Sequence, residues 1–176
     1  KRRGARTLLD ILFNYIVRWL APFLVFTCEE AWKSKGNSSS IHLEEFLKTG
    51  IKFKNDIIAK KWEKIKDVRK VITGALEVKR ADKTIGSSLE SHIDIYLSEE
   101  IKSKIDNIDL AEIAITSSAV VIVGENSSSG FSIDDIKDIV VNVKKAKGLK
   151  CKRCWKFDSD INSSGICKRC SDVIKK

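Results

Sequence analysis

Residues 151–170 have the sequence CKRCWKFDSDINSSGICKRC, and this stretch decides how the C-terminal part of the chain folds. Twelve residues separate two Cys-x-x-Cys pairs, Cys151 with Cys154 and Cys167 with Cys170. Each pair can place two thiolates on one metal ion, and two pairs complete a tetrahedron. The residues between them suffice for a short two-stranded ribbon. We therefore predict a four-cysteine zinc ribbon or knuckle with one structural Zn²⁺ per chain.

Disulfides and a redox-active cysteine pair are the alternative interpretations of the two pairs. Disulfides suit an oxidising compartment, and a redox pair usually opens a helix after a strand. Iron in a rubredoxin-like site would use the same four ligands, so the spacing leaves it open. The pattern offers no open ligand position and no nearby general base, which indicates a structural site. The fifth cysteine, Cys28, lies in an apolar helix and is predicted to be a buried small side chain.

Trp155 follows the second cysteine directly and has basic neighbours in Lys152, Arg153 and Lys156. Bases of single-stranded nucleic acid stack on exposed aromatic rings while cations contact the phosphates. These four residues are therefore the predicted RNA contacts of the module. The alternative is that the indole caps the small metal-bound core.

The net charge of +9 is unevenly distributed along the 176 residues. Residues 1–87 carry 19 basic and 10 acidic side chains, residues 88–143 carry 3 and 11, and residues 144–176 carry 11 and 3. A polyanion would be attracted to both ends and repelled by the middle. Chance clustering on a solvated surface is the alternative, because basic patches are a permissive signal.

Helical periodicity dominates the first half of the chain. It predicts one helix to about Leu20 and a second from Pro22 to about Lys33, because proline suits the first turn of a helix but not its interior. A long helix is predicted from Asp56 to Asp82, with basic residues on its polar side that suit solvent as well as RNA. The stripes predicted to face a core are Leu8, Leu9, Leu12, Phe13, Ile16, Trp19 and Leu20 in the first helix, Phe23, Phe26 and Trp32 in the second, and Ile58, Trp62, Ile65, Val68, Ile72 and Leu76 in the third.

The middle of the chain predicts a small α+β unit. Residues 89–97 alternate between apolar and polar side chains, which indicates a half-buried strand with His92 on its polar face. Further strands are predicted at residues 119–123 and 139–143, and short helices at residues 99–105 and 109–115. The whole is predicted to be mainly α: a helical part at residues 1–86, the α+β unit at residues 87–146 and the zinc-binding module at residues 147–176.

Four segments resemble the C-terminal part of bacterial isoleucyl-tRNA synthetases, and the resemblance covers essentially the whole chain. They are VRWLAPFLVFTCEEAW (17–32), SIHLEEF (40–46), RADKTIGSSLE (80–90), and AKGLKCKRCW (146–155) with the second cysteine pair. The first segment alone would also fit valyl- or leucyl-tRNA synthetases, whereas the last two together point to the isoleucine enzymes. A related zinc finger ends some DNA glycosylases, but those lack the helical part.

The resemblance implies that residues 1–86 form a helical anticodon-binding domain that holds the stem-loop of isoleucine tRNA. By the same analogy, Arg153 and Trp155 would contact the anticodon loop, and Arg69 and Lys79 the stem. The family often has proline at the position of Lys152, a difference that should loosen the first cysteine turn slightly but add charge.

The resemblance also implies a parent enzyme, a class I ligase that uses ATP to attach isoleucine to its tRNA, acting as a cytoplasmic monomer. The activation motifs His-x-Gly-His and Lys-Met-Ser-Lys-Ser are absent from this sequence, which has two histidines and no methionine. We therefore expect a fragment without the catalytic and editing domains, inactive alone and not itself an ATP-binding chain. No apolar run is long enough to cross a bilayer. The alternative is a stand-alone zinc-ribbon protein that binds nucleic acid.

Overall fold

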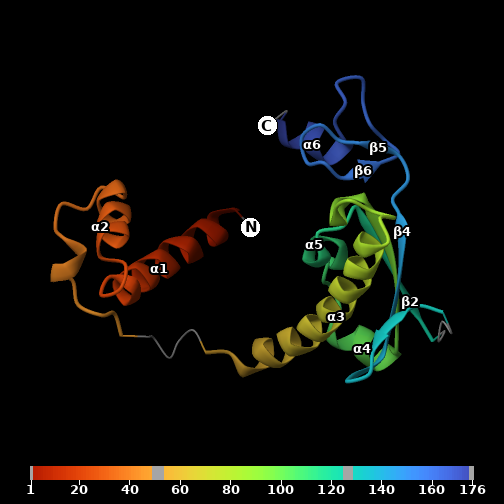
Figure 1. Cartoon of the computed structure of the whole chain (residues 1–176), viewed down its shortest axis with the longest axis horizontal. Helices are drawn as coiled ribbons and strands as arrows, with labels where there is room; N and C mark the ends of the chain where they lie inside the picture. The colour runs from red at the N-terminus through yellow and green to blue at the C-terminus, as the bar shows by residue number, and fades with distance from the viewer. Residues whose placement is uncertain (1, 49–53, 125–128, 175–176) are drawn as a thin grey trace. The chain divides into compact units, whose positions relative to one another are not determined.

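The computed structural model describes residues 2–48, 54–124 and 129–174. Its contacts divide the chain into two compact units, Lys1–Lys54 and Asn55–Lys176. Helices, a four-stranded sheet and a cysteine cluster give a mixed α/β architecture (Figure 1). This corrects the expectation of a mainly α protein. The helices were expected, but the sheet is more extensive than the three short strands that the sequence predicted.

The described residues of the first unit form two helices and a short 3-10 turn. Their bounds are α1 Arg2–Leu20, α2 Val25–Ser34 and η1 Ile41–Leu43. The end of α1 confirms the prediction, but α2 begins three residues after Pro22. A turn occupies the intervening residues, in which the Phe23 N–H donates to the Leu20 carbonyl at 2.9 Å.

The buried core of the first unit is small. It consists of Val17, Ala21, Cys28, Trp32 and Ile41, with Phe13 packed against it. The burial of Cys28 confirms its predicted role. Arg18 stacks over the Trp32 ring at 4.7 Å and donates to Glu44 at 2.7 Å, which ties α1 to the segment after η1.

Most of the apolar stripe predicted to face a core in the first unit is exposed. Phe23 and Phe26 are 83% and 88% exposed. The exposed members of the predicted stripe on α1 are Leu8, Leu9, Leu12, Ile16, Trp19 and Leu20. A periodic pattern specifies the conformation that the chain adopts but not what packs against it. The prediction of a buried stripe was therefore wrong for these residues, whereas Trp32 is buried and Phe13 packs against the core as predicted.

The second unit is built on a sheet of strand order β2-β1-β4-β3. Strand β1 pairs with β2 in parallel and with β4 antiparallel, and β3 pairs antiparallel with β4. The parallel pair is joined through the short helices α4 and α5. The bounds are η3 Ser88–Glu90, β1 Ser91–Leu97, α4 Glu99–Lys104, α5 Leu110–Ala114, β2 Ser118–Val123, β3 Phe131–Ile133 and β4 Ile136–Lys145.

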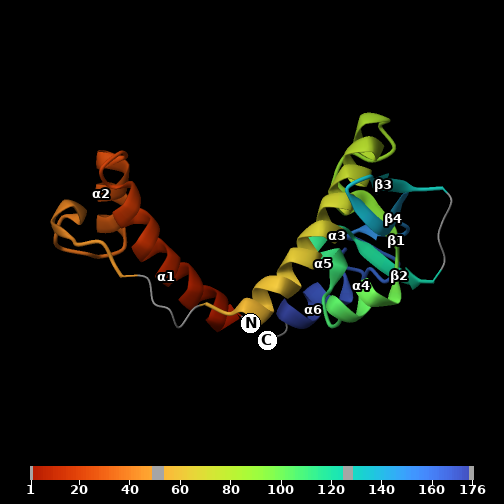
Figure 2. The same cartoon turned by 90° about the horizontal axis from the view of Figure 1, so that it is seen from below.

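Helix α3 (Asp56–Ala81) covers one face of this sheet, on the same side as α4 and α5 (Figure 2). The side chain of Asn55 caps its first turn by accepting the Ile58 N–H at 3.0 Å. The shared core joins residues of α3 to residues of β1 and β4, namely Ile65, Val68, Val71, Ile72, Ala75, Leu76, Ile93, Ile95, Leu97, Ile139, Val141 and Val143. Ile58 and Trp62, predicted on the buried face, are 52% and 41% exposed because the first turns of α3 extend beyond this core.

Helix α3 therefore belongs to the same compact unit as the sheet. The expected division at residues 86 and 87 falls within the second unit. The domain ranges 1–86, 87–146 and 147–176 stay a prediction.

The C-terminal module follows the end of β4 and comprises β5 (Leu149–Lys150), β6 (Phe157–Asp158) and α6 (Lys168–Ile174) (Figure 1). The two strands pair antiparallel. Helix α6 was not predicted. The Phe157 N–H donates to the Ser117 hydroxyl at 2.7 Å, which attaches the module to the sheet. Across the described parts of the chain, no helix has both the length and the apolar character that a membrane span requires.

Gly148, which precedes β5, is a position that only glycine suits. Its φ is +99°, and a Cβ there would overlap the Asp158 carbonyl group on β6. Gly36 has a similar φ of +93° but open space around it. Any difference between alanine at the two positions therefore measures the overlap and not the backbone conformation.

We predict that Gly148→Ala costs clearly more stability than Gly36→Ala, each measured by equilibrium denaturation of the chain. The left-handed conformation alone should cost about 1–2 kcal/mol at either position. At Gly148 the β5–β6 pair must also separate, which should show as faster amide hydrogen exchange over residues 149–158. Equal costs at the two glycines would contradict the close approach of Gly148 to β6.

Candidate metal centre and nucleic-acid surface

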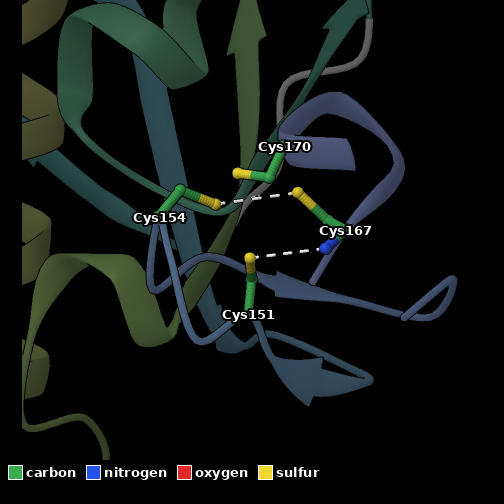
Figure 3. Close-up of side chains that lie close together, drawn as sticks. All are labelled: Cys151, Cys154, Cys167 and Cys170. Carbon is green, nitrogen blue, oxygen red and sulfur yellow. Dashed lines mark hydrogen bonds between the residues drawn. The ribbon is translucent and has the colours of Figure 1, made fainter. Parts of the chain in front are cut away.

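The four C-terminal cysteines converge on one point. Their sulfur atoms all lie within 4.8 Å of one another, and Figure 3 shows them directed toward a common centre. The Sγ atoms of Cys154 and Cys167 are 3.7 Å apart. A tetrahedral ion with metal–sulfur bonds of about 2.3 Å requires about 3.8 Å between sulfurs. All four thiols are free rather than paired in disulfides, so the cluster can hold a metal ion.

The backbone around the cluster explains this convergence. Cys151 follows β5 directly, and the Trp155 N–H closes the first turn by donating to the Cys151 carbonyl at 2.9 Å. A second turn forms where the Gly165 N–H donates to the Asn162 carbonyl at 2.8 Å. Helix α6 then carries Cys170 back toward the other thiols. Few apolar side chains of the described residues support this arrangement, since Ile161 and Ile166 are the ones among them that pack beside the cysteines.

Backbone amides and burial shift the thiol pKa values in opposite directions. The amide of Cys154, followed by that of Cys167, lowers the pKa of Cys151 to about 6 against the effect of burial. The Cys167 N–H lies 3.3 Å from the Cys151 sulfur. Burial raises the pKa of Cys167 to about 12 and also raises that of Cys154. Because metals bind thiolates, an ion must displace the protons of these buried thiols.

The Trp155 indole does not belong to the apolar cluster around the cysteines. It is 60% exposed, and its backbone has a φ of +65°, which is rare for a side chain of this size. The Lys150 ammonium lies 5.7 Å from the ring centroid. The ring thus presents a flat apolar surface beside a cation, an arrangement that can stack a nucleic acid base. This geometry does not match the alternative of an indole that caps the metal core.

The structure separates the other predicted RNA contacts into two places. Lys152 and Arg153 are exposed and Lys156 is half-buried, all within the turn that carries Trp155. Arg69 and Lys79 lie on α3 instead. Lys79 is paired with Asp82 at 3.0 Å, whereas Arg69 is exposed and has no ion-pair partner in the described ranges.

A second group of cations was missed by the sequence analysis. Lys144, Lys145 and Lys147 line a cavity of about 570 Å³ together with residues of β1, β2 and β6. The closely spaced lysines in the basic C-terminal region were the available signal. The lining residues from the other strands are distant in sequence, so only the fold brings them together.

Comparisons with known proteins identify the family of the chain. A model of the family described as "Anticodon-binding domain of tRNA ligase" matches residues 1–97. Isoleucine–tRNA ligase of Bartonella henselae is 41% identical over 165 residues, and that of Agrobacterium fabrum is 42% identical over 165 residues. Each alignment covers 93% of this chain but only 17% of the relative, so the chain spans about a sixth of the length of these proteins.

The family match covers more than half of the chain, and the relatives align with nearly all of it. The resemblance predicted from the four sequence segments is confirmed. The chain therefore belongs to the family of anticodon-binding domains of tRNA ligases, in the form found in bacterial isoleucine–tRNA ligases.

Proposed function

We propose that this chain is the C-terminal tRNA-binding region of an isoleucine–tRNA ligase and that it recognises the anticodon stem-loop of isoleucine tRNA. The observation that carries the proposal is the family match over residues 1–97 combined with about 40% identity over nearly the whole chain. A stand-alone zinc-ribbon protein is disfavoured, because the similarity continues through the helical part as well as the cysteine module.

The proposed parent is a class I ligase that uses ATP to attach isoleucine to its tRNA, as a monomer in the cytoplasm. This region would contribute binding free energy far from the reacting groups. Binding of remote parts of a substrate can be used to position the reacting end, so a distant contact adds selectivity to catalysis elsewhere. The chain alone, without the activation motifs, should not aminoacylate.

We propose Zn²⁺ as the ion held by Cys151, Cys154, Cys167 and Cys170. A four-thiolate tetrahedron suits zinc or iron, and the proposed role is structural, which zinc fulfils without redox chemistry. The ion would replace the apolar core that this module lacks. It would thereby hold the turn that carries the RNA contacts.

We propose that Arg153 and Trp155 contact the anticodon loop, with Lys152 and Lys156 beside them. Arg69 is the proposed stem contact on α3, since its side chain is exposed. Lys79 could join it only by exchanging its ion pair with Asp82 for a phosphate.

Binding to isoleucine tRNA and to a non-cognate tRNA, each at two salt concentrations, tests the proposed function. We expect tighter binding of isoleucine tRNA at both concentrations, with weaker binding of both tRNAs at the higher salt because phosphate contacts release counterions. If the chain binds both tRNAs equally and both affinities fall equally at the higher salt, binding is charge attraction without recognition, contrary to the proposal.

Removing the metal with a chelator should unfold the C-terminal module selectively. Amide hydrogen exchange over residues 149–170 should accelerate, because so small a module needs its metal to fold. Amide hydrogen exchange over β1 should not change, because β1 belongs to the core between α3 and the sheet, which does not depend on the metal. Metal analysis should find one zinc per chain before treatment. Unchanged exchange in the module, or stoichiometric iron with visible colour, would contradict the zinc proposal.

Trp155→Ala should weaken RNA binding by about 1–3 kcal/mol, the contribution of stacking one base. Trp155→Phe is the matched control, because it keeps an aromatic surface and should restore most of the affinity. Both variants should retain their metal, since the indole lies outside the cysteine core. Unchanged affinity of the alanine variant would leave the ring without a role in binding.

A further inference from the structure

The cavity of about 570 Å³ lies where the sheet meets the C-terminal module. One wall comes from the beginnings of β1 and β2 and the end of β4, and the other from β6 and the residue after it. The side chains that matter for its chemistry are His92, Ser118, Lys144, Lys145, Lys147 and Phe157. We propose that this cavity binds a phosphodiester group of the RNA backbone, a role that rests on the proposed function and adds a second contact point to it.

The charges around the cavity favour an anion. Lys144 is held by Asp94 at 2.6 Å, so its charge is largely compensated. Within the described ranges, neither Lys145 nor Lys147 has an ion-pair partner. Asp158 is the one carboxylate of the described lining, and it accepts the Asp160 N–H at 3.0 Å. Two uncompensated cations therefore face one carboxylate, and the cavity stays positive.

The polar wall of the cavity is held in place before any ligand binds. His92 contacts the Ser118 hydroxyl through Nδ1 at 2.7 Å and Asp94 through Nε2 at 3.0 Å. Because these three side chains fix one another, seating an anion beside them requires little reordering. A hydrogen-bonding wall next to exposed lysines is an arrangement that contacts phosphate oxygens well.

The lining favours a phosphodiester over an apolar small molecule. Sites for small molecules are mostly lined by apolar and aromatic side chains, whereas this one is lined mainly by lysine, serine and histidine. Phe157 is the exception and is half-buried. It also lies two residues from Trp155, a separation of at most about 7 Å along an extended backbone. An RNA strand with one base stacked on the Trp155 indole would therefore pass close to the cavity.

The test compares two double variants of the zinc-loaded chain. Lys145→Gln with Lys147→Gln removes the two uncompensated cations of the cavity. Lys102→Gln with Lys137→Gln removes the same charge away from the cavity, on α4 and at the beginning of β4. All four lysines are exposed, so both variants should fold, which circular dichroism and metal content would verify.

We measure the affinity for isoleucine tRNA and for a non-cognate tRNA across a series of salt concentrations. In the cavity variant, loss of one phosphate contact should reduce the magnitude of the slope of log K against log salt by about 0.7–0.9. Binding to both tRNAs should weaken by a similar factor. The control variant should keep the slope of the unaltered chain.

Three results would overturn the proposal in distinguishable ways. If the cavity variant keeps the slope and affinity of the control while the unaltered chain still prefers isoleucine tRNA, the cavity is not a backbone site and the proposed function stands. If inorganic phosphate binds through the two lysines but RNA binding does not depend on them, the cavity is a free-anion site. If the unaltered chain binds no tRNA, both the proposed function and this inference fail.

Discussion

Burial of one face of α3 against β1 and β4 is the interaction on which the second unit depends. Val68, Val71 and Ile72 are fully buried, as are Ile93 and Ile95 on the facing strand. Each such side chain contributes about 1.5–3 kcal/mol relative to an exposed one. Because β4 continues directly toward β5, this core also determines where the cysteine module begins. The metal then orders a segment too poor in apolar side chains to fold unaided.

Elements with a clear period were predictable from the sequence, and short ones were not. The single apolar face of α3 predicted its bounds to within one residue, because 26 residues contain many repeats of the pattern. Strand β3 has three residues, too few to show a period. Helix α6 begins between the two cysteines of the second pair, whose spacing indicated a metal-binding turn and concealed the helix. The exposed side chain of Phe26 shows that the partner of an apolar face is not encoded in its periodicity.

In the candidate site, too, some features could be predicted from the sequence and others could not. The four cysteines could be identified from spacing alone, because tetrahedral coordination restricts where thiolates can lie along a chain. The exposure of Trp155 was predicted only as one of two alternatives, because it depends on a turn in which a bulky residue adopts a left-handed conformation. The cavity joins His92 to Lys147 across 55 positions of sequence, so a local pattern could not reveal it.

The family match and the folding unit end at different places. Residues 1–97 stop at the last residue of β1, a central strand whose two neighbours, β2 and β4, lie further along the chain. A polypeptide cut after Leu97 would leave both edges of β1 open and would remove the part of the α3 core that β4 supplies, which invites aggregation. The boundary between the two compact units falls between Lys54 and Asn55. In this protein the end of the family match is thus no guide to where the chain can be divided.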